Sequence, residues 1–210
     1  LHTSPLAQPG SGDSGGMNVY VRELVSSLAQ GGIDCTTFTR ATHPDQRRVV
    51  QVEPGHRVVH VPAGAHDLAK DDLLSVVPEF TDRVAAHLSG EFPADVLHAN
   101  YWLSGLSAHR LKHELGLPFV TTFHTLARVK AEGGDAESHV REQAELEIIG
   151  CADAVCVNCS EEESQFRRLY GDPPGRIEVV APAVEHAFFA PGERSGARQA
   201  LGLPADAPVL

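Results

Sequence analysis

A glycine-rich stretch near the start of the chain is the first feature whose composition suggests chemistry. Residues 9–18, Pro-Gly-Ser-Gly-Asp-Ser-Gly-Gly-Met-Asn, contain four glycines and lead directly into a helical pattern. Glycines allow the backbone to come close to a ligand, and a helix N-terminus offers N–H groups with a partial positive charge. The spacing differs from the dinucleotide G-x-G-x-x-G pattern, and no P-loop Gly-Lys-Ser/Thr follows. The stretch predicts an anion-binding loop, with a flexible surface loop as the alternative.

Polar residues also follow two of the expected strands. Tyr101 comes after the strand expected at 95–99, and His124 and Thr125 come after the strand expected at 119–123. In parallel α/β sheets, ligands bind beyond the carboxyl ends of the strands. These side chains are therefore candidates for a binding site, with structural hydrogen bonding of the histidine and packing of the aromatic ring as the alternatives.

Four cations and the single tryptophan have less specific explanations. Taken alone, Lys70, Arg128, Lys130 and Arg141 are each expected to be solvated surface residues. Trp102 is expected to be a packing residue at the start of a helix.

Composition excludes several classes of protein. The chain has 210 residues, enough for one domain with a substantial core, and its net charge of −11 argues against a general nucleic-acid binder. No apolar run has the length of a membrane span and no signal peptide is visible, so we expect a cytoplasmic protein without an integral membrane segment. No second Cys or His pair accompanies Cys156-x-x-Cys159, so we expect no metal site and four small, buried thiols.

Apolar periodicity predicts an alternation of strands and helices. Helices are expected at 17–30, 70–88, 103–115, 138–149, 160–170 and 195–201. Strands are expected at 33–40, 49–52, 57–61, 95–99, 119–123, 154–158 and 177–180, the second and third paired as a hairpin. Pro78 marks a kink or break in the second helix, and Ser160 with Glu163 forms a capping box for the fifth.

This alternation indicates an α/β fold with a Rossmann-like, doubly wound parallel sheet. One domain is expected over residues 1–192. Residues 193–210 are expected to begin a linker toward a further domain, because they end at what looks like the entry to another strand. The chain is therefore expected to be truncated at both ends.

Three segments of the chain resemble the family-4 glycosyltransferases of the GT-B fold. They are residues 12–21, Gly-Asp-Ser-Gly-Gly-Met-Asn-Val-Tyr-Val, residues 98–105, His-Ala-Asn-Tyr-Trp-Leu-Ser-Gly, and residues 123–126, Phe-His-Thr-Leu. The resemblance runs from His2 to about Gly192. It implies the N-terminal, acceptor-binding half of a GT-B enzyme, without its first strand and without the second Rossmann-like domain that binds most of the nucleotide sugar.

The resemblance also implies roles for individual residues. The phosphate of the acceptor would be bound by Lys70, Tyr101, Thr125 and Arg141. An inositol ring would contact His2, Asp13, Ser14, Gly15, Met17 and Asn18. The donor diphosphate would approach Gln8, Pro9 and Gly16, and His124 would position or polarise the donor sugar.

The implied activity is a retaining transfer of N-acetylglucosamine from UDP-GlcNAc to an inositol phosphate. It requires no protein nucleophile, because positioning and stabilisation of the leaving diphosphate do most of the work. No cofactor is implied in this half, and any Mg²⁺ would belong to the absent domain. The chain alone is expected not to turn over substrate, and a homodimer is the expected assembly if the chain self-associates.

Two alternatives remain open at this point. The first is a family-4 transferase with another acceptor, such as a sugar phosphate (as in enzymes like sucrose-phosphate synthase), a lipid-linked sugar or a natural-product aglycone. The second is a nucleotide-binding Rossmann domain without transferase activity, against which the lack of G-x-G-x-x-G counts.

Overall fold

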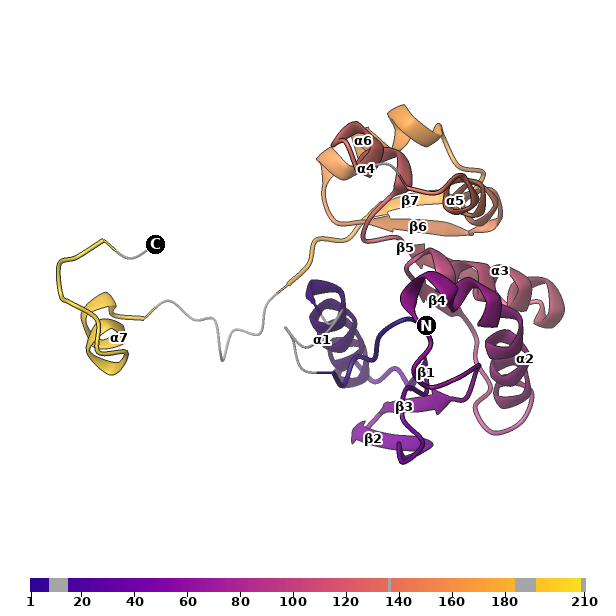
Figure 1. The fold of residues 1–210 in the computed structure, drawn as a ribbon, viewed down its shortest axis with the longest axis horizontal. Helices are drawn as coiled ribbons and strands as arrows, with labels where there is room; N and C mark the ends of the chain where they lie inside the picture. The colour runs from indigo at the N-terminus through magenta and orange to yellow at the C-terminus, as the bar shows by residue number, and fades with distance from the viewer. Residues whose placement is uncertain (8–14, 136, 184–191, 209–210) are drawn as a thin grey trace.

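The computed structural model describes residues 1–7, 15–135, 137–183 and 192–208, and Figure 1 shows the arrangement of their helices and strands. The helices are α1 Gly16–Gln30, the 3-10 helix η1 Lys70–Val76, α2 Val77–Leu88, α3 Trp102–Leu115, α4 Ala127–Glu132, α5 His139–Cys151, α6 Ser160–Tyr170 and α7 Arg194–Ala200. The strands are β1 Cys35–Arg40, β2 Val49–Glu53, β3 His56–Val61, β4 Leu97–Asn100, β5 Phe119–Thr122, β6 Ala154–Val157 and β7 Arg176–Val179. The short helix α4 is the element that apolar periodicity does not predict.

The strands form two sheets. β4, β5, β6 and β7 lie in that order in a four-stranded sheet whose three pairs are all parallel. The second sheet has the order β1-β3-β2, in which β1 pairs parallel with β3 while β2 and β3 form the expected antiparallel hairpin. Parallel neighbours need crossover connections, and the helices between the strands supply them. The predicted α/β class with a parallel sheet is confirmed.

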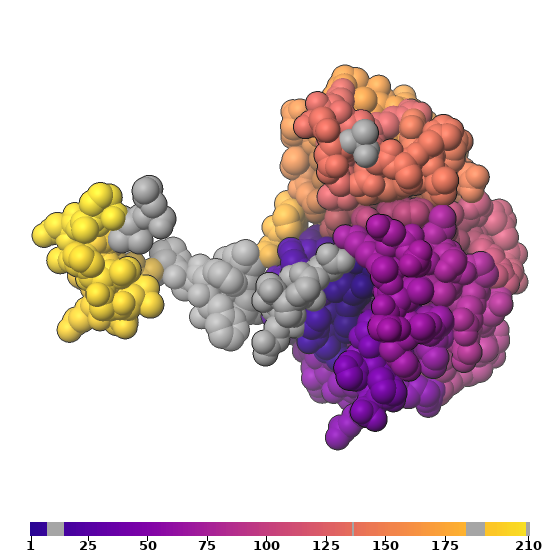
Figure 2. Space-filling view, in the orientation of Figure 1, coloured from indigo at the N-terminus to yellow at the C-terminus, as the bar shows by residue number. Residues whose placement is uncertain are grey.

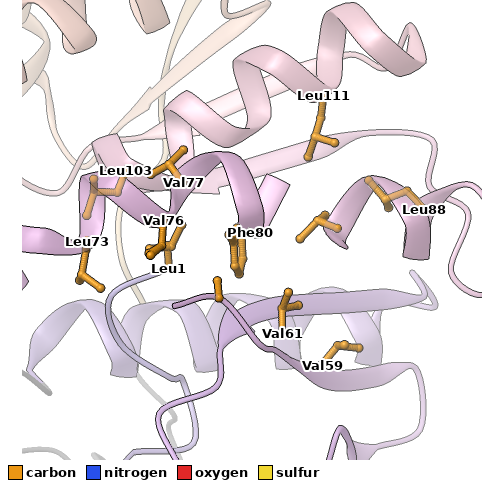
Figure 3. Packing of buried hydrophobic residues seen from close by; sticks show 12 residues of the cluster. Leu1, Val59, Val61, Leu73, Val76, Val77, Phe80, Leu88, Leu103 and Leu111 are labelled. Carbon is orange, nitrogen blue, oxygen red and sulfur yellow. The ribbon is translucent and has the colours of Figure 1, made fainter. Parts of the chain in front are cut away.

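The edge strands β1 and β4 both line a cavity of about 660 Å³. Helices α1, α2 and α3 also line it, together with the N-terminal segment and the loops before β1 and β4. β1 is hydrogen-bonded to β3, and β4 is hydrogen-bonded to β5. Among the described strands, β1 and β4 therefore do not pair with each other, and the two sheets remain separate. Leu1 lies beside this space and is buried against α2 (Figure 3).

Two clusters of buried side chains form the core. The first packs η1, α2 and α3 over β3, and Figure 3 shows Phe80 of α2 above Val61 of β3. The second packs α3, α5 and α6 on β5 and β6, and its fully buried members include Phe119, Ile148, Val155 and Phe166. Trp102 packs against both clusters, which confirms the packing role expected for it.

The expected helix over 70–88 is broken rather than kinked. A 3-10 helix ends at Val76, and α2 begins at Val77 with Pro78 in its first turn. Proline is accepted there because the first N–H groups of a helix have no partner within the helix.

The cap of α6 differs from the expected capping box. Cys159, not Ser160, is the capping residue: its sulfur accepts from the N–H of Glu162 at 3.5 Å, and the Glu162 carboxylate accepts from the N–H of Asn158 at 2.6 Å. Because β6 ends at Val157, the chain turns one residue earlier than a Ser160 cap would need. The expectation of buried thiols is also wrong, since Cys159 is exposed and the other three cysteines are only half-buried.

Helix α7 lies apart from the two sheets in Figures 1 and 2. Arg198 ties this helix to the segment that follows it, because its guanidinium donates to the carbonyls of Pro204 and Ala207. The domain division expected at residue 192 stays a prediction. Across the described ranges, no helix is long and apolar enough to cross a membrane.

Close packing of α3 on α5 leads to a prediction. A Cβ at Gly105 of α3 would come within 2.7 Å of Ile148 Cδ1 on α5. We expect Gly105→Ala to destabilise the fold by about 1–2 kcal/mol, because overpacking outweighs the gain in helix propensity. Gly150→Ala in α5 is the matched control: a Cβ there meets no atom within 4 Å, so the change should stabilise by up to about 1 kcal/mol. Urea unfolding measures both, and equal stabilities would contradict the close packing.

Candidate functional site

A pocket of about 800 Å³ lies where β4 and β5 end and several helices begin. Its wall includes Gly16 at the start of α1, Lys70 at the start of η1, Trp102 at the start of α3 and Ser138, which caps α5. Helix N-termini carry a partial positive charge and N–H groups without partners inside the helix. Four helix starts at one pocket favour a negatively charged ligand.

The pocket brings together most of the residues to which the resemblance assigns a role. Nine of them line it: His2, Gly15, Gly16, Met17, Lys70, Tyr101, His124, Thr125 and Arg141. Asn18 does not, because its buried side chain donates to Thr3 Oγ1 and to the carbonyl of Ser4, both at 2.7 Å. Gln8, Pro9, Asp13 and Ser14 lie outside the described residues. The grouping is a structural finding, whereas the ligand contacts of these residues stay predictions.

Arg141 is held in place by hydrogen bonds along its whole guanidinium group. Nε donates to Glu145 Oε1 at 2.8 Å and Nη1 to Glu137 Oε1 at 2.7 Å. Nη2 donates to the carbonyl and to Oγ1 of Thr125, at 2.8 and 3.0 Å. The guanidinium also lies over the ring of Tyr101, 5.1 Å from the ring centroid. Three of the four residues assigned to the acceptor phosphate are thus in direct contact.

Glu145 is fully buried behind Arg141. Besides Arg141, its carboxylate accepts from the N–H of Ala127 at 2.9 Å and from the hydroxyl of Tyr170 at 2.5 Å. Burial and the hydrogen bond to Glu145 raise the pKa of Tyr170, so this hydroxyl keeps its proton and donates. Arg141 and Glu145 stand four residues apart on α5, a spacing visible in the sequence, but sequence reasoning missed the pair because its burial comes from α4 and α6.

Two residues beside the pocket have a strained backbone. Tyr101 and His124 have φ angles of 76° and 64°, and they are the two non-glycine residues with positive φ in the described parts of the chain. Tyr101 donates its N–H to the carbonyl of Thr122 at 2.9 Å, which ties the turn after β4 to the end of β5. Such conformations cost about 1–3 kcal/mol each and concentrate at ligand sites.

His124 has a neutral imidazole. Burial, and to a smaller extent the charge of His98, lower the pKa of His124 from 6.5 to about 4. Its Nε2 lies 2.9 Å from Asn100 Oδ1, and its ring packs edge-on to Tyr20, with centroids 4.9 Å apart. Because an amide oxygen only accepts, Nε2 carries the proton and Nδ1 is the acceptor. This ring is suited to orienting a hydroxyl, not to neutralising a phosphate.

Gly15 and Gly16 leave space at the start of α1. No described atom lies within 4 Å of the position where a Cβ would stand at either glycine, and neither has a positive φ. No acidic side chain lies in the first turn of α1. The surrounding residues therefore do not require these glycines for packing, whereas a ligand approaching the helix N-terminus would benefit from their small size.

Among the described residues that line the pocket, the cations outnumber the carboxylates. These charged residues are the cations Lys70, Lys130 and Arg141 and the carboxylates Asp71 and Glu137. Lys130, expected from the sequence to be a solvated surface cation, lines the pocket and is ion-paired to Glu137. Glu137 accepts from both Lys130 and Arg141, and so occupies donors that an anionic ligand would use.

The lowered pKa of His124 predicts a pH dependence of stability. An unfolded chain takes up a proton near pH 6.5, but the folded ring resists protonation until about pH 4. The free energy of unfolding should therefore fall as the pH decreases through this window. His124→Gln should flatten that part of the stability–pH curve measured by urea unfolding, and an identical slope in the variant would contradict the burial of a neutral ring.

The buried carboxylate of Glu145 gives a second prediction. Glu145→Gln should lower the free energy of unfolding by about 3 kcal/mol, because it leaves Arg141 without its buried counter-charge. Glu163→Gln removes a carboxylate at the same i,i+4 spacing from an exposed pair with Arg167, and should change stability by less than about 1 kcal/mol. Chemical denaturation of both variants measures these changes. Similar losses in the free energy of unfolding would contradict a larger contribution from the buried carboxylate of Glu145.

Known proteins match this chain along its whole length, and the chain covers about half of each of the two relatives described below. A glycosyl transferase 4-like domain matches residues 15–183. The chain is 42% identical to D-inositol 3-phosphate glycosyltransferase 2 of Catenulispora acidiphila, covering all of this chain and 51% of that protein. It is 41% identical to the D-inositol 3-phosphate glycosyltransferase of Saccharomonospora viridis, covering 50% of that protein. The chain thus spans about half the length of the curated relatives it matches.

A solved structure is also similar along almost the whole chain. The sucrose-phosphate synthase of Thermosynechococcus elongatus superimposes with a TM-score of 0.90 at 30% identity, over 99% of this chain and 52% of that one. The family match includes the start of α1, both strand-end segments of the pocket and all seven strands. The chain therefore belongs to the glycosyl transferase 4-like family, with the fold of a GT-B glycosyltransferase.

Proposed function

We propose that this chain is the acceptor-binding half of a retaining glycosyltransferase that transfers N-acetylglucosamine from UDP-GlcNAc to 1D-myo-inositol 3-phosphate. The names of the curated relatives support an inositol phosphate acceptor. The reaction would take place in the cytoplasm of an actinobacterium as the first step of mycothiol biosynthesis. The pocket at the ends of β4 and β5 is the proposed acceptor site.

The observation that carries this proposal is the joint arrangement of Arg141, Thr125 and Tyr101, with Lys70 lining the same pocket. Guanidinium and ammonium groups form charge-assisted hydrogen bonds to phosphate oxygens, and the planar guanidinium is preorganised for them. Hydroxyl groups supply further donors. We infer that the phosphate takes the place of Glu137 on Nη1 of Arg141, while Glu145 keeps the guanidinium oriented from behind.

The donor would meet this chain at the N-terminus of α1. A diphosphate would lie beside Gly15 and Gly16, where no described atom stands within 4 Å of an added Cβ, and the neutral ring of His124 would orient a sugar hydroxyl. In a retaining transfer, the acceptor hydroxyl forms the new bond to the anomeric carbon on the face that the diphosphate leaves, and its proton departs with the diphosphate. A separate domain would bind the nucleotide, so this chain alone is proposed to bind the acceptor without turnover.

A second acceptor class is favoured by one observation. The solved structure with a TM-score of 0.90 is named a sucrose-phosphate synthase. A sugar phosphate acceptor would use the same phosphate-binding cations as inositol phosphate and would differ only in its ring contacts. Direct comparison of ligands is therefore needed to separate the two.

Calorimetric titration of this chain with 1D-myo-inositol 3-phosphate tests the proposal. Lys70→Ala should weaken binding by about 10–100-fold, since it removes a hydrogen bond between charged groups worth about 1.5–3 kcal/mol. Lys70 is preferred to Arg141 because removing Arg141 would leave Glu145 buried without a counter-charge.

The control removes the same charge elsewhere. Arg83 is exposed on α2 and pairs with Glu79 away from the pocket, so Arg83→Ala should leave the affinity unchanged. Equal affinity of the wild-type chain and Lys70→Ala would refute the acceptor site. Tighter binding of glucose or fructose phosphates than of inositol phosphate would favour the second acceptor class.

A further inference from the structure

Three metal-ligating side chains meet on the outer side of α3 and α5, away from the pocket. His109 and His113 stand one turn apart on α3, and Cys151 is the last residue of α5. One ligand atom from each lies within 4.8 Å of the other two. The two imidazole centroids are 5.1 Å apart, and Cys151 Sγ lies 3.4 Å from His113 Nε2.

The donor set and its spacing fit a tetrahedral transition-metal ion. Two imidazole nitrogens and a thiolate sulfur are ligands that zinc takes in proteins. Zinc–nitrogen bonds of about 2.0–2.1 Å and zinc–sulfur bonds of about 2.3 Å place nitrogen and sulfur about 3.5 Å apart in a tetrahedron. The Cys151–His113 separation of 3.4 Å is close to this value, and the ligand atom of His109 lies within 4.8 Å of both, so coordination would draw His109 closer.

The cluster is built on an anchored helix contact. Lys112, between the two histidines, donates to the carbonyl of Cys151 at 2.8 Å and to Asp153 Oδ2 at 2.7 Å. One helical turn earlier on α5, the contact of Ile148 with Gly105 brings the two helices close. The end of α5 is therefore fixed on α3 without a metal. His109 and Cys151 are half-buried and His113 is exposed, so an ion can reach the site.

The three side chains leave one coordination position open. A tetrahedral ion held by His109, His113 and Cys151 needs a fourth ligand, and a water molecule would supply it. Glu147 precedes Cys151 by one helical turn on α5, but its carboxylate lies outside the group of ligand atoms that are within 4.8 Å of one another.

We propose that His109, His113 and Cys151 bind a zinc ion that clamps the C-terminal half of α3 to the C-terminal end of α5. On binding, the thiol of Cys151 releases its proton to solvent, and the thiolate sulfur and two neutral imidazole nitrogens coordinate the ion. At 1.5 Å per residue, His109 is about 12 Å along α3 from Tyr101, so the ion does not contact the acceptor pocket. Its role is structural, and it is independent of which acceptor the pocket binds.

Cobalt substitution tests the site directly. The untagged chain, stripped with EDTA and kept reduced, is titrated with Co²⁺ and then with Zn²⁺. We expect one equivalent of Co²⁺ to produce ligand-field bands of a tetrahedral ion and a thiolate-to-cobalt charge-transfer band, and Zn²⁺ to displace both. Zn²⁺ should also raise the thermal unfolding temperature of the wild-type chain, because it binds the folded state.

Matched variants decide whether these residues are the ligands. Cys151→Ser should abolish the charge-transfer band, and His109→Gln or His113→Gln should weaken Co²⁺ binding more than tenfold. Cys159→Ser and His139→Gln remove an exposed cysteine and an exposed histidine elsewhere and should bind like the wild type. Unfolding curves in EDTA show that each variant is folded. A charge-transfer band that survives Cys151→Ser, or the absence of any stoichiometric Co²⁺ spectrum in the wild-type chain, would overturn the proposal.

Discussion

The buried ion pair of Arg141 and Glu145 is the interaction on which the pocket depends. Burying a carboxylate away from solvent costs several kcal/mol unless hydrogen-bond donors surround it. Glu145 accepts hydrogen bonds from donors at the start of α4, at the end of α6 and on Arg141 of its own helix. Each of these partners is thereby fixed relative to α5. The guanidinium in turn holds the carbonyl and hydroxyl of Thr125. The loop after β5 is thus oriented, through Arg141, by the carboxylate of Glu145, which is fully buried and does not line the pocket.

Electrostatics of the pocket come from backbone geometry as much as from side chains. The chain carries a net charge of −11, so a basic surface is not what would attract an anion. Instead, α1, η1, α3 and α5 all begin at the pocket, and their N-terminal ends face the same volume as Lys70 and Arg141. The strained turns at Tyr101 and His124 are what allow α3 and the β5–α4 connection to start there. The fold offsets this strain with the packing of Trp102 and the hydrogen bond from Tyr101 to Thr122.

Sequence patterns predicted what depends on local periodicity and missed what depends on tertiary contact. Strands and most helices followed from apolar spacing, and the rule of ligands at strand ends was enough to group Tyr101 with His124. Lys70 and Arg141 needed the family resemblance, since nothing in their neighbourhoods distinguishes them from surface cations. Asn18 does not line the pocket, because its side chain donates to Thr3 and Ser4, and its contact with the acceptor stays a prediction. The i,i+4 spacing of Arg141 with Glu145, and of His109 with His113, is visible in the sequence. Only the packing of α3, α4, α5 and α6 shows that the first pair is buried and that the second is clustered with Cys151.

Helices α3 and α5 connect these findings, because each has one end at the pocket. Tyr101 precedes α3, Arg141 lies in the first turn of α5, and the contact of the ring with the guanidinium depends on how the two helices are set against each other. The proposed transfer has no protein nucleophile and would rely on positioning, so small displacements of these groups would lower its rate. The close approach of Ile148 to Gly105 fixes the two helices against each other along their length. The hydrogen bond from Lys112 to the carbonyl of Cys151 fixes their ends on the side away from the pocket. The geometry of the pocket is therefore a property of the helix pair as a whole and not only of the loops that line it.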